Sequence, residues 1–195
     1  MPCLVTFTKY PFLSGICDNQ TFLEPFYEMA SSIKERAELE KILVNIQLAP
    51  VGVLCLTYPL NNTEDFEDGV YLDTSGAIGV DLLNHPTRSE VSKAAVKQDR
   101  YTIQGPIPLV QGSASVVDEA VIARYPISVD YFNHTIDGEV YPFWGFSIAL
   151  MDWDKLKSKI GIYDFFAKDG LEFKMTRTDV VENITTGENY LKVSG

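Results

Sequence analysis

The sequence predicts an α+β domain with an antiparallel sheet. An amphipathic helix and a β-hairpin come first, a short strand and a second helix follow, and three strand-like runs then come in succession. Consecutive strands joined by short turns pair antiparallel, and helices segregated from them pack on the sheet. With 195 residues, 46% of them hydrophobic and 12% aromatic, the chain is long enough for one well-buried domain, or one domain and part of a second.

Charge and cysteine content exclude several classes of protein. The net charge of -11 argues against binding to nucleic acid or to an anionic membrane surface, because both attract basic patches. No stretch approaches the roughly 18 uninterrupted apolar residues of a membrane span, so we expect the chain itself to be soluble. The three cysteines, Cys3, Cys17 and Cys55, lack metal-ligand spacing, so at most one disulfide forms and its pairing stays open.

An amphipathic helix is predicted over residues 22–40. Thr21 and Glu24 have the spacing of a capping box, and Pro25 fits only in the first turn. Apolar residues recur at helical spacing, at Phe22, Phe26, Ala30, Ile33 and Ala37. We expect this helix to pack across the sheet. A homodimer through the same helix is a further hypothesis; light scattering at high protein concentration tests it, and a strict monomer would remove it for this chain.

A β-hairpin is predicted next. Apolar side chains alternate with polar ones over residues 44–48, with Asn45 and Gln47 as the polar members. Proline and glycine in residues 49–52 favour a tight turn, and residues 53–60 supply the return strand.

An acidic segment, residues 61–76, is predicted to be a loop. It lacks the spaced ligands and the glycine of an EF-hand, so no metal site is predicted there. Residues 77–83 are predicted to form a short apolar strand with one acid, Asp81, which needs a partner or water if it is buried. Residues 87–90 have the form of a second capping box and start a helix that ends near residue 98.

The central strand is predicted over residues 100–112. Thr102 and Gln104 alternate with Tyr101 and Ile103, which is typical of a strand with one polar and one apolar face. Glycine and proline after Gln104 interrupt the strand, because proline has no N–H to donate. Polar side chains that face inward from an interrupted strand make a ligand cavity. The alternative is a kinked structural strand.

Two strands complete the predicted sheet, at residues 120–129 and 141–151, with a polar turn between them and a short helix over residues 153–159 after them. Residues 161–195 then contain a second predicted hairpin with too few apolar residues for a core of its own. That segment belongs to a smaller appended unit present in part, or packs back on the first helix.

The predicted domain boundaries follow from this order. Residues 1–43 form an N-terminal helical segment, residues 44–160 form the main domain, and residues 161–195 form part of a smaller unit.

Few residues in the chain support catalysis. Only His85 and His134 titrate near neutral pH, and no nucleophile elbow, phosphate-binding glycine loop or zinc-protease motif occurs. We therefore predict no catalytic residue, no metal and no cofactor.

Arg124 is the most informative polar residue, because it stands in an otherwise apolar strand, where a guanidinium needs a partner or a path to water. Two interpretations stay open: an internal salt bridge with Asp81 or Glu139, or capture of a carboxylate or other anion. Tyr58 and Trp144 are candidate pocket walls, although aromatic strand residues are more often plain core.

Six short runs carry a resemblance to a known family. They are Gln-Leu-Ala-Pro-Val-Gly-Val (47–53), Tyr-Pro-Leu (58–60), Gly-Val-Asp-Leu-Leu (79–83), Gly-Pro-Ile-Pro-Leu-Val-Gln-Gly (105–112), Arg-Tyr-Pro-Ile (124–127) and Phe-Trp-Gly-Phe (143–146). In order and approximate spacing they resemble CHASE domains, the extracytoplasmic sensor modules of bacterial diguanylate cyclases and histidine kinases and of plant cytokinin receptors. The resemblance covers about residues 40–160.

The resemblance implies a PAS-like fold, an antiparallel sheet with flanking helices set on a long N-terminal helix. A smaller, membrane-proximal PAS-like unit follows it, and residues 161–195 are then part of that second unit. It also implies that Asp81 holds a ligand and that the strand around Thr102 and Ile103 supplies main-chain contacts. After residue 60 the chain departs from the bacterial pattern, with a longer acidic insertion in place of Gly-Asn-Glu, which changes the rim of the expected pocket.

The predicted function is an extracytoplasmic, non-catalytic sensor domain that binds a small-molecule ligand, in a full-length protein anchored in the cell membrane with a diguanylate cyclase or histidine kinase output. The candidate ligand-binding residues are Tyr58, Asp81, Thr102, Ile103, Gln104, Arg124 and Trp144. The alternatives are a ligand-free interaction or scaffold module and a secreted hydrolase. A cavity lined by Asp81, Thr102 and Arg124 favours the sensor, whereas a nucleophile and a base within hydrogen-bond reach favour the hydrolase.

Overall fold

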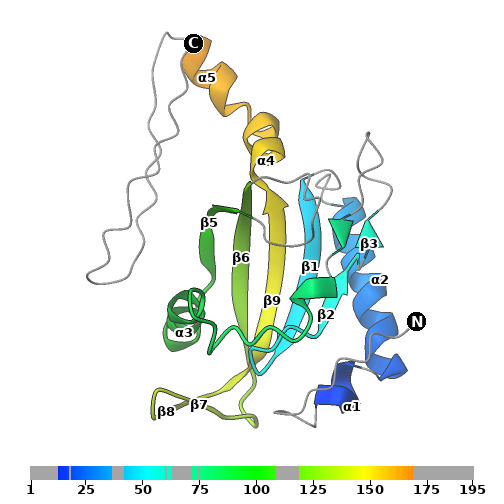
Figure 1. Cartoon of the computed structure of the whole chain (residues 1–195), viewed down its shortest axis with the longest axis vertical. Helices are drawn as coiled ribbons and strands as arrows, with labels where there is room; N and C mark the ends of the chain where they lie inside the picture. Colours follow the sequence, from blue (N-terminus) through cyan, green and yellow to red (C-terminus); the bar gives the residue numbers. More distant parts are fainter. Residues whose placement is uncertain are drawn as a thin grey trace.

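A five-stranded antiparallel sheet forms the centre of the molecule in a computed structural model, which describes residues 13–17, 19–36, 42–59, 61–62, 72–73, 75–108 and 119–168 (Figure 1). The strands are β1 (Leu43–Pro50), β2 (Leu56–Tyr58), β5 (Thr102–Pro108), β6 (Glu119–Ser128) and β9 (Phe143–Asp152), in the order β2-β1-β9-β6-β5. The predicted α+β class with an antiparallel sheet is confirmed, and the architecture is compatible with a PAS-like fold.

Two small strand pairs lie outside this sheet. β3 (Asn61–Asn62) pairs with β4 (Leu72–Asp73), and β7 (His134–Ile136) pairs with β8 (Glu139–Tyr141). The β7–β8 hairpin occupies the segment predicted as a polar turn, and its tight turn contains Asp137 at a φ of 52°.

Apolar clusters cover both faces of the sheet. On the inner face, Ile122, Ile148 and Leu150 pack against the segment of residues 77–98. On the outer face, residues of β1 and β2 pack against α1 (Ser14–Cys17) and α2 (Gln20–Arg36). Figure 1 shows α2 beside the β1–β2 end of the sheet and α3 (Ser89–Gln98) beside the β5–β6 end. Because both faces of β1 are covered, all eight of its residues are buried, the polar ones included.

Helix α2 overlaps the predicted helix, but it begins earlier, at Gln20, so Pro25 lies inside the helix and not in its first turn, and the predicted capping box at Thr21 is not its start. Asn19 caps it, because its side-chain oxygen accepts hydrogen bonds from the backbone N–H of Thr21 at 3.0 Å and from the Thr21 hydroxyl at 2.7 Å. Phe26 and Ala30 of the predicted apolar stripe are buried on the outer face of the sheet, whereas Ile33 of the same stripe is 44% exposed. The predicted continuation to residue 40 lies outside the described residues.

One disulfide joins Cys17 in α1 to Cys55, just before β2, with the two Cα atoms 5.5 Å apart. The bond ties the N-terminal helices to the sheet across a sequence separation of 38 residues. The pairing that the sequence left open is therefore Cys17 with Cys55, and Cys3 lies outside the described residues.

The predicted hairpin is confirmed, with a shorter return strand. Gln47 pairs with Thr57 across β1 and β2, and the tight turn uses Val51 and Gly52, both with positive φ. A side chain at Gly52 would meet the side chain of Leu83 at 2.7 Å, so glycine is needed both for its backbone angle and for space.

The prediction of a strand over residues 77–83 is wrong. A single 3-10 turn, Ser75–Ala77, leads into bends, and only Asp81 makes an isolated bridge, with Val53. Gly79 has a φ of 88°, which breaks an extended strand, and the Asp81 carboxylate accepts hydrogen bonds from the next turn instead. The segment is still held to the hairpin by backbone bonds, among them Leu54 N–H to Val80 O at 2.9 Å.

Helix α3 confirms the predicted second helix, although the capping box does not form. Arg88 occupies the N-cap position and makes no side-chain capping bond. The Thr87 N–H and hydroxyl instead lie 3.2 and 3.3 Å from the Nδ1 atom of His85. The helix ends where Asp99 adopts a left-handed conformation with a φ of 46°.

Strand β5 confirms the prediction that its polar side chains face inward and its apolar ones lie on the opposite face. Tyr101 and Ile103 are 65% and 64% exposed, whereas Thr102 and Gln104 are half-buried toward the inner face. The prediction that this is the central strand is wrong, because β5 lies at the edge of the sheet and β9 lies at its centre. An edge is where proline is tolerated, and the register of β5 with β6 shifts between Gln104 and Ile107.

The chain leaves the sheet through two short helices. The Asp152 side chain caps α4 (Trp153–Lys159) by accepting a hydrogen bond from the Lys155 N–H at 2.9 Å, and α5 (Ile162–Lys168) follows directly. Helix α4 confirms the predicted short helix. The hairpin predicted beyond residue 168 lies outside the described residues.

Candidate functional site

A row of polar side chains crosses the inner face of the sheet. Gln47 in β1 and Arg124 in β6 both pair with Ile148 in β9, and Thr102 in β5 pairs with Arg124. Directly paired residues on adjacent strands project to the same face, so these side chains lie side by side. Thr57 extends the row through its pairing with Gln47. The sheet thus carries a polar row beneath an otherwise apolar layer.

Arg124 is the largest member of the row and is fully buried, with 1% of its surface exposed. Its Nη1 atom donates a hydrogen bond to the Gln104 side-chain oxygen at 3.0 Å, and its Nε atom has no partner among the described residues. Burial, together with a smaller effect of the nearby charge of Arg88, lowers the pKa of the guanidinium to about 10. Arg124 is therefore a cation held in the core without an ion pair to any carboxylate of the described residues.

Other buried polar atoms of the inner face also have no hydrogen-bond partner among the described residues. They are both side-chain amide atoms of Asn45 and the hydroxyls of Thr57 and Thr102. Asn45 lies on the inner face because it pairs with Leu150, which pairs in turn with Ile122. Buried polar groups are almost always paired in native proteins, so a group of unpaired ones calls for a ligand or bound water.

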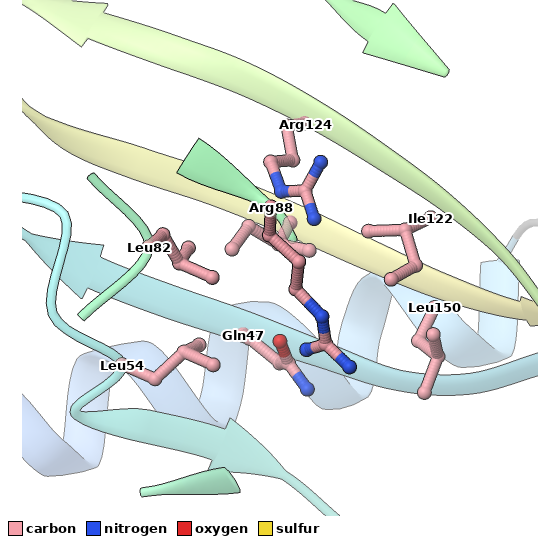
Figure 2. Close-up of a pocket in the computed structure, with 8 residues that line it drawn as sticks. Gln47, Leu54, Leu82, Arg88, Ile122, Arg124 and Leu150 are labelled. Atoms are coloured by element: carbon pink, nitrogen blue, oxygen red, sulfur yellow. The ribbon is translucent and has the colours of Figure 1, made fainter. Parts of the chain in front are cut away.

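A cavity lies over this row (Figure 2). It is lined by Gln47, Leu54, Leu82, Arg88, Ile122, Arg124, Ile148 and Leu150. Its volume of about 10 Å³ is room for about one water molecule. Figure 2 shows the side chain of Arg88 reaching across the cavity toward Gln47, with Arg124 on the strand behind it. A larger ligand requires the side chains above the sheet to move.

Arg88 gives the cavity a second guanidinium. It stands at the start of α3, is half-buried, and has its pKa lowered by that burial. Neither Arg88 nor Arg124 forms an ion pair with a carboxylate in the described part of the chain. Of the two interpretations of Arg124, the internal salt bridge with Asp81 or Glu139 is not formed. The cavity is positively charged within an acidic protein.

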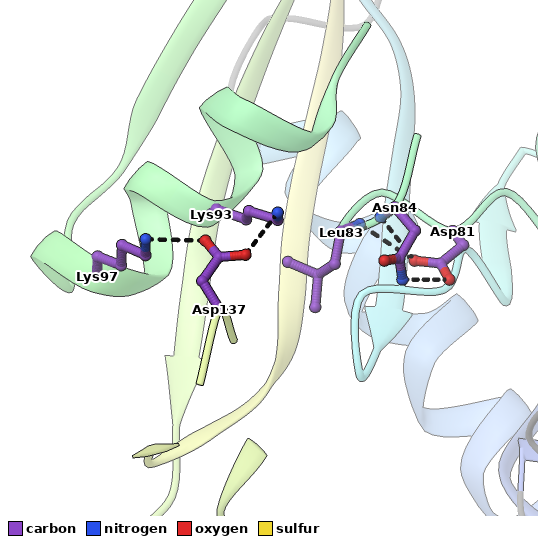
Figure 3. A network of polar contacts seen from close by, with 6 residues as sticks. All are labelled: Asp81, Leu83, Asn84, Lys93, Lys97 and Asp137. Carbon is purple, nitrogen blue, oxygen red and sulfur yellow. Dashed lines mark hydrogen bonds and ion pairs between the residues drawn. The ribbon is translucent and has the colours of Figure 1, made fainter. Parts of the chain in front are cut away.

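Asp81 has a local structural role (Figure 3). One carboxylate oxygen accepts from the backbone N–H groups of Leu83 and Asn84, both at 3.2 Å, and the other accepts from the Asn84 side chain at 2.9 Å. The carboxylate thus stabilises the turn that carries Leu82 over the sheet, and Asp81 is not among the residues that line the cavity.

Tyr58 and Trp144 lie on the outer face. Tyr58 contacts the ring of Tyr27 and Trp144 contacts the ring of Phe22, with ring centroids 5.9 and 6.2 Å apart, both across the interface with α2. Ile103 is exposed on the outer side of β5. Of the candidate residues, the structure therefore brings together Thr102, Gln104 and Arg124. Tyr58, Ile103 and Trp144 lie on the other side of the sheet.

Four residues of the site were missed by the sequence interpretation: Asn45, Gln47, Thr57 and Arg88. The alternation of β1 contains the signal for Asn45 and Gln47, and Thr57 follows from the hairpin register. Because that register pairs Gln47 with Thr57, the inner face receives Thr57, and the adjacent Tyr58 points outward. Arg88 had no such signal, since it lay inside a stretch interpreted as a helix cap.

Two ion pairs hold α3 over the inner face. Asp137, in the β7–β8 turn, accepts from Lys93 at 2.8 Å and from Lys97 at 2.9 Å (Figure 3). These bonds lower the pKa of Asp137. They are exposed, so each stabilises the fold little, but together they connect the helix that follows Arg88 to the hairpin.

Two further tests define what the described part of the chain contains. No group of three or more histidine, cysteine or acidic side chains is placed to hold a metal ion within the described residues. None of the described helices is long and apolar enough to span a membrane.

Comparison with known proteins shows the family. The model of the CHASE domain matches residues 71–185, more than half of the chain. The match begins later and ends later than the resemblance detected in the sequence, about residues 40–160. No curated protein and no solved structure shows significant similarity to the chain. The chain belongs to the CHASE domain family and is an extracytoplasmic sensor module of the kind found in signalling proteins.

Proposed function

We propose that this sensor module binds a small molecule on the inner face of its sheet, in a full-length protein anchored in the membrane. The observation that supports this most strongly is the row of buried polar side chains on that face, whose unpaired atoms include the Nε atom of Arg124 at the cavity. A scaffold module gains nothing from such a row, because each unpaired buried group destabilises the fold by about 1–3 kcal/mol. A ligand supplies the missing partners.

The route to an output runs through β9. Ile148 and Leu150 line the cavity, and the same strand continues without a loop into α4 and then α5. A ligand that binds one arrangement of the inner face better than another shifts the population of the two, and the helices attached to β9 move with it. By family membership, we propose a diguanylate cyclase or a histidine kinase as the output domain.

The second candidate is a ligand-free interaction module. One observation favours it: the cavity is small, with room for about one water molecule. The two candidates differ in what happens when a residue of the polar row is replaced by an apolar one, because only a sensor then loses ligand binding.

A thermal-shift screen of small metabolites on the 195-residue chain tests the proposal, with the variant Gln47→Leu as comparison. Gln47 is buried and lines the cavity, and leucine is close to it in size. We expect at least one compound to raise the melting temperature of the wild type and to raise that of Gln47→Leu by less. Without any compound, the melting temperature of Gln47→Leu should lie within a few degrees of the wild type. The interaction module is favoured if every stabilising compound acts equally on both proteins, or if no compound stabilises the wild type.

A further inference from the structure

The cavity holds two positive charges and no negative one. Arg124 and Arg88 both line it, and no carboxylate of a described residue pairs with either. Like charges at close range oppose each other, and burial removes the water that would otherwise screen them. In a chain with a net charge of -11, a cavity of this kind selects for an anion.

The unused edge of Arg124 indicates the shape of that anion. Its Nη1 atom already donates to Gln104, while Nε is unpaired. Nε and Nη2 form one edge of the guanidinium, and this edge binds the two oxygens of a carboxylate through parallel hydrogen bonds. Arg88 lies on the opposite, half-buried side of the cavity and is free to close over the bound group.

The rest of the lining argues for an organic ligand. Leu54, Leu82, Ile122, Ile148 and Leu150 surround the charged groups. A phosphate dianion needs donors on all sides, whereas a planar carboxylate with a short carbon chain places its apolar part against these walls. Gln47, which also lines the cavity, has a side-chain amide that is suited to a hydroxyl or carbonyl on the same ligand.

We infer that the ligand of this sensor is a small organic carboxylate, bound by the free edge of Arg124 and covered by Arg88. This inference rests on the proposed function and specifies the class of molecule that the site takes. Because the cavity holds about one water molecule, the carboxylate enters by displacing the Arg88 side chain from its place above the row.

The test compares acids with their amides on the full 195-residue chain. Acetate, succinate and malate are titrated by calorimetry against acetamide and succinamide, with inorganic phosphate as a further anion. We expect at least one carboxylate to bind and its amide to bind at least tenfold more weakly, because a charge-assisted pair is lost. In Arg88→Gln the affinity for that carboxylate falls about ten- to a hundredfold. Arg100→Gln, an exposed change of the same kind, leaves the affinity unchanged.

The two histidines supply a second readout by NMR. Burial lowers the pKa of His85, and the charges of Arg88 and Arg124 lower it further. A carboxylate between the arginines offsets those charges, so the pKa of His85 rises when it binds. The pKa of His134 is lowered by its own burial and not by these arginines, so it stays constant. A shift of both histidines, or of neither, contradicts binding at this site.

The outcomes separate the ligand class from the proposed function. If a neutral compound from the thermal-shift screen binds at Gln47 and no carboxylate binds, the carboxylate inference is wrong and the sensor proposal stands. If phosphate binds more tightly than every carboxylate, the class is wrong in the same way. If amides bind as well as acids, or Arg88→Gln binds as tightly as the wild type, the arginines do not select the ligand.

Discussion

Replacing Arg124 with methionine should stabilise the ligand-free domain and abolish carboxylate binding. The lowering of the Arg124 pKa to about 10 corresponds to roughly 3 kcal/mol against the charged folded state, at about 1.4 kcal/mol per pKa unit. Methionine fills a similar volume without a charge, although it leaves the Gln104 oxygen without its donor. The expected net gain in the free energy of unfolding is about 1–3 kcal/mol, measured by urea denaturation.

The pH dependence of this difference follows from the direction of the shift. A base whose folded-state pKa is lowered destabilises the folded state wherever it is charged. That penalty fades only as the pH rises above the folded-state pKa of about 10 toward the pKa of the unfolded chain. The gain of Arg124→Met over the wild type should therefore be constant between about pH 6 and 9. Arg100→Met, at an exposed arginine, should change stability by less than about 0.5 kcal/mol. A less stable Arg124→Met would show that Arg124 has a stabilising partner.

Removing the disulfide between Cys17 and Cys55 should have the largest destabilising effect. The bond closes a long loop and holds α1 and α2 against the outer face, so its loss frees the unfolded chain and detaches the N-terminal helices. For a loop of this length the expected loss is about 2–4 kcal/mol in the free energy of unfolding. Disulfides persist in oxidising compartments, which agrees with the extracytoplasmic place of CHASE domains.

The comparison of Cys17→Ser, Cys55→Ser and the double variant isolates this bond. All three variants should have the same urea midpoint of unfolding, below that of the wild type. Adding a reductant to the wild type should lower its urea midpoint to that of the variants. Cys3→Ser serves as the control and should match the wild type. Single variants that differ from each other by more than about 1 kcal/mol would mean that the thiols contribute separately through packing.

The sequence predicted the parts of the fold that depend on local pattern. The alternation of Thr102 and Gln104 with Tyr101 and Ile103 correctly predicted that the polar side of β5 faces inward. The strand predicted over residues 77–83 was wrong because a positive φ at Gly79 and the side-chain bonds of Asp81 are invisible to an apolar pattern.

The candidate site depended on register, which local pattern does not supply. Tyr58 and Thr57 are neighbours in sequence, yet only Thr57 lies on the inner face, because Gln47 pairs with it. Trp144 faces α2 for a similar reason, because alternate residues of β9 point to opposite faces of the sheet. Arg88 comes from a turn whose course above the sheet depends on tertiary contacts. Arg124 alone was identified from its chemistry, since a guanidinium in an apolar strand needs an explanation wherever the strand lies.

A crystal structure of the domain with saturating succinate, or with whichever carboxylate of the panel binds most tightly, tests the central claim most directly. We predict that the ligand lies on the inner face between Arg124 and Arg88, with a carboxylate against the Nε edge of Arg124 and the Arg88 side chain moved from its position in Figure 2. A ligand bound against α2 on the outer face, or an inner face unchanged around a water molecule, would contradict it.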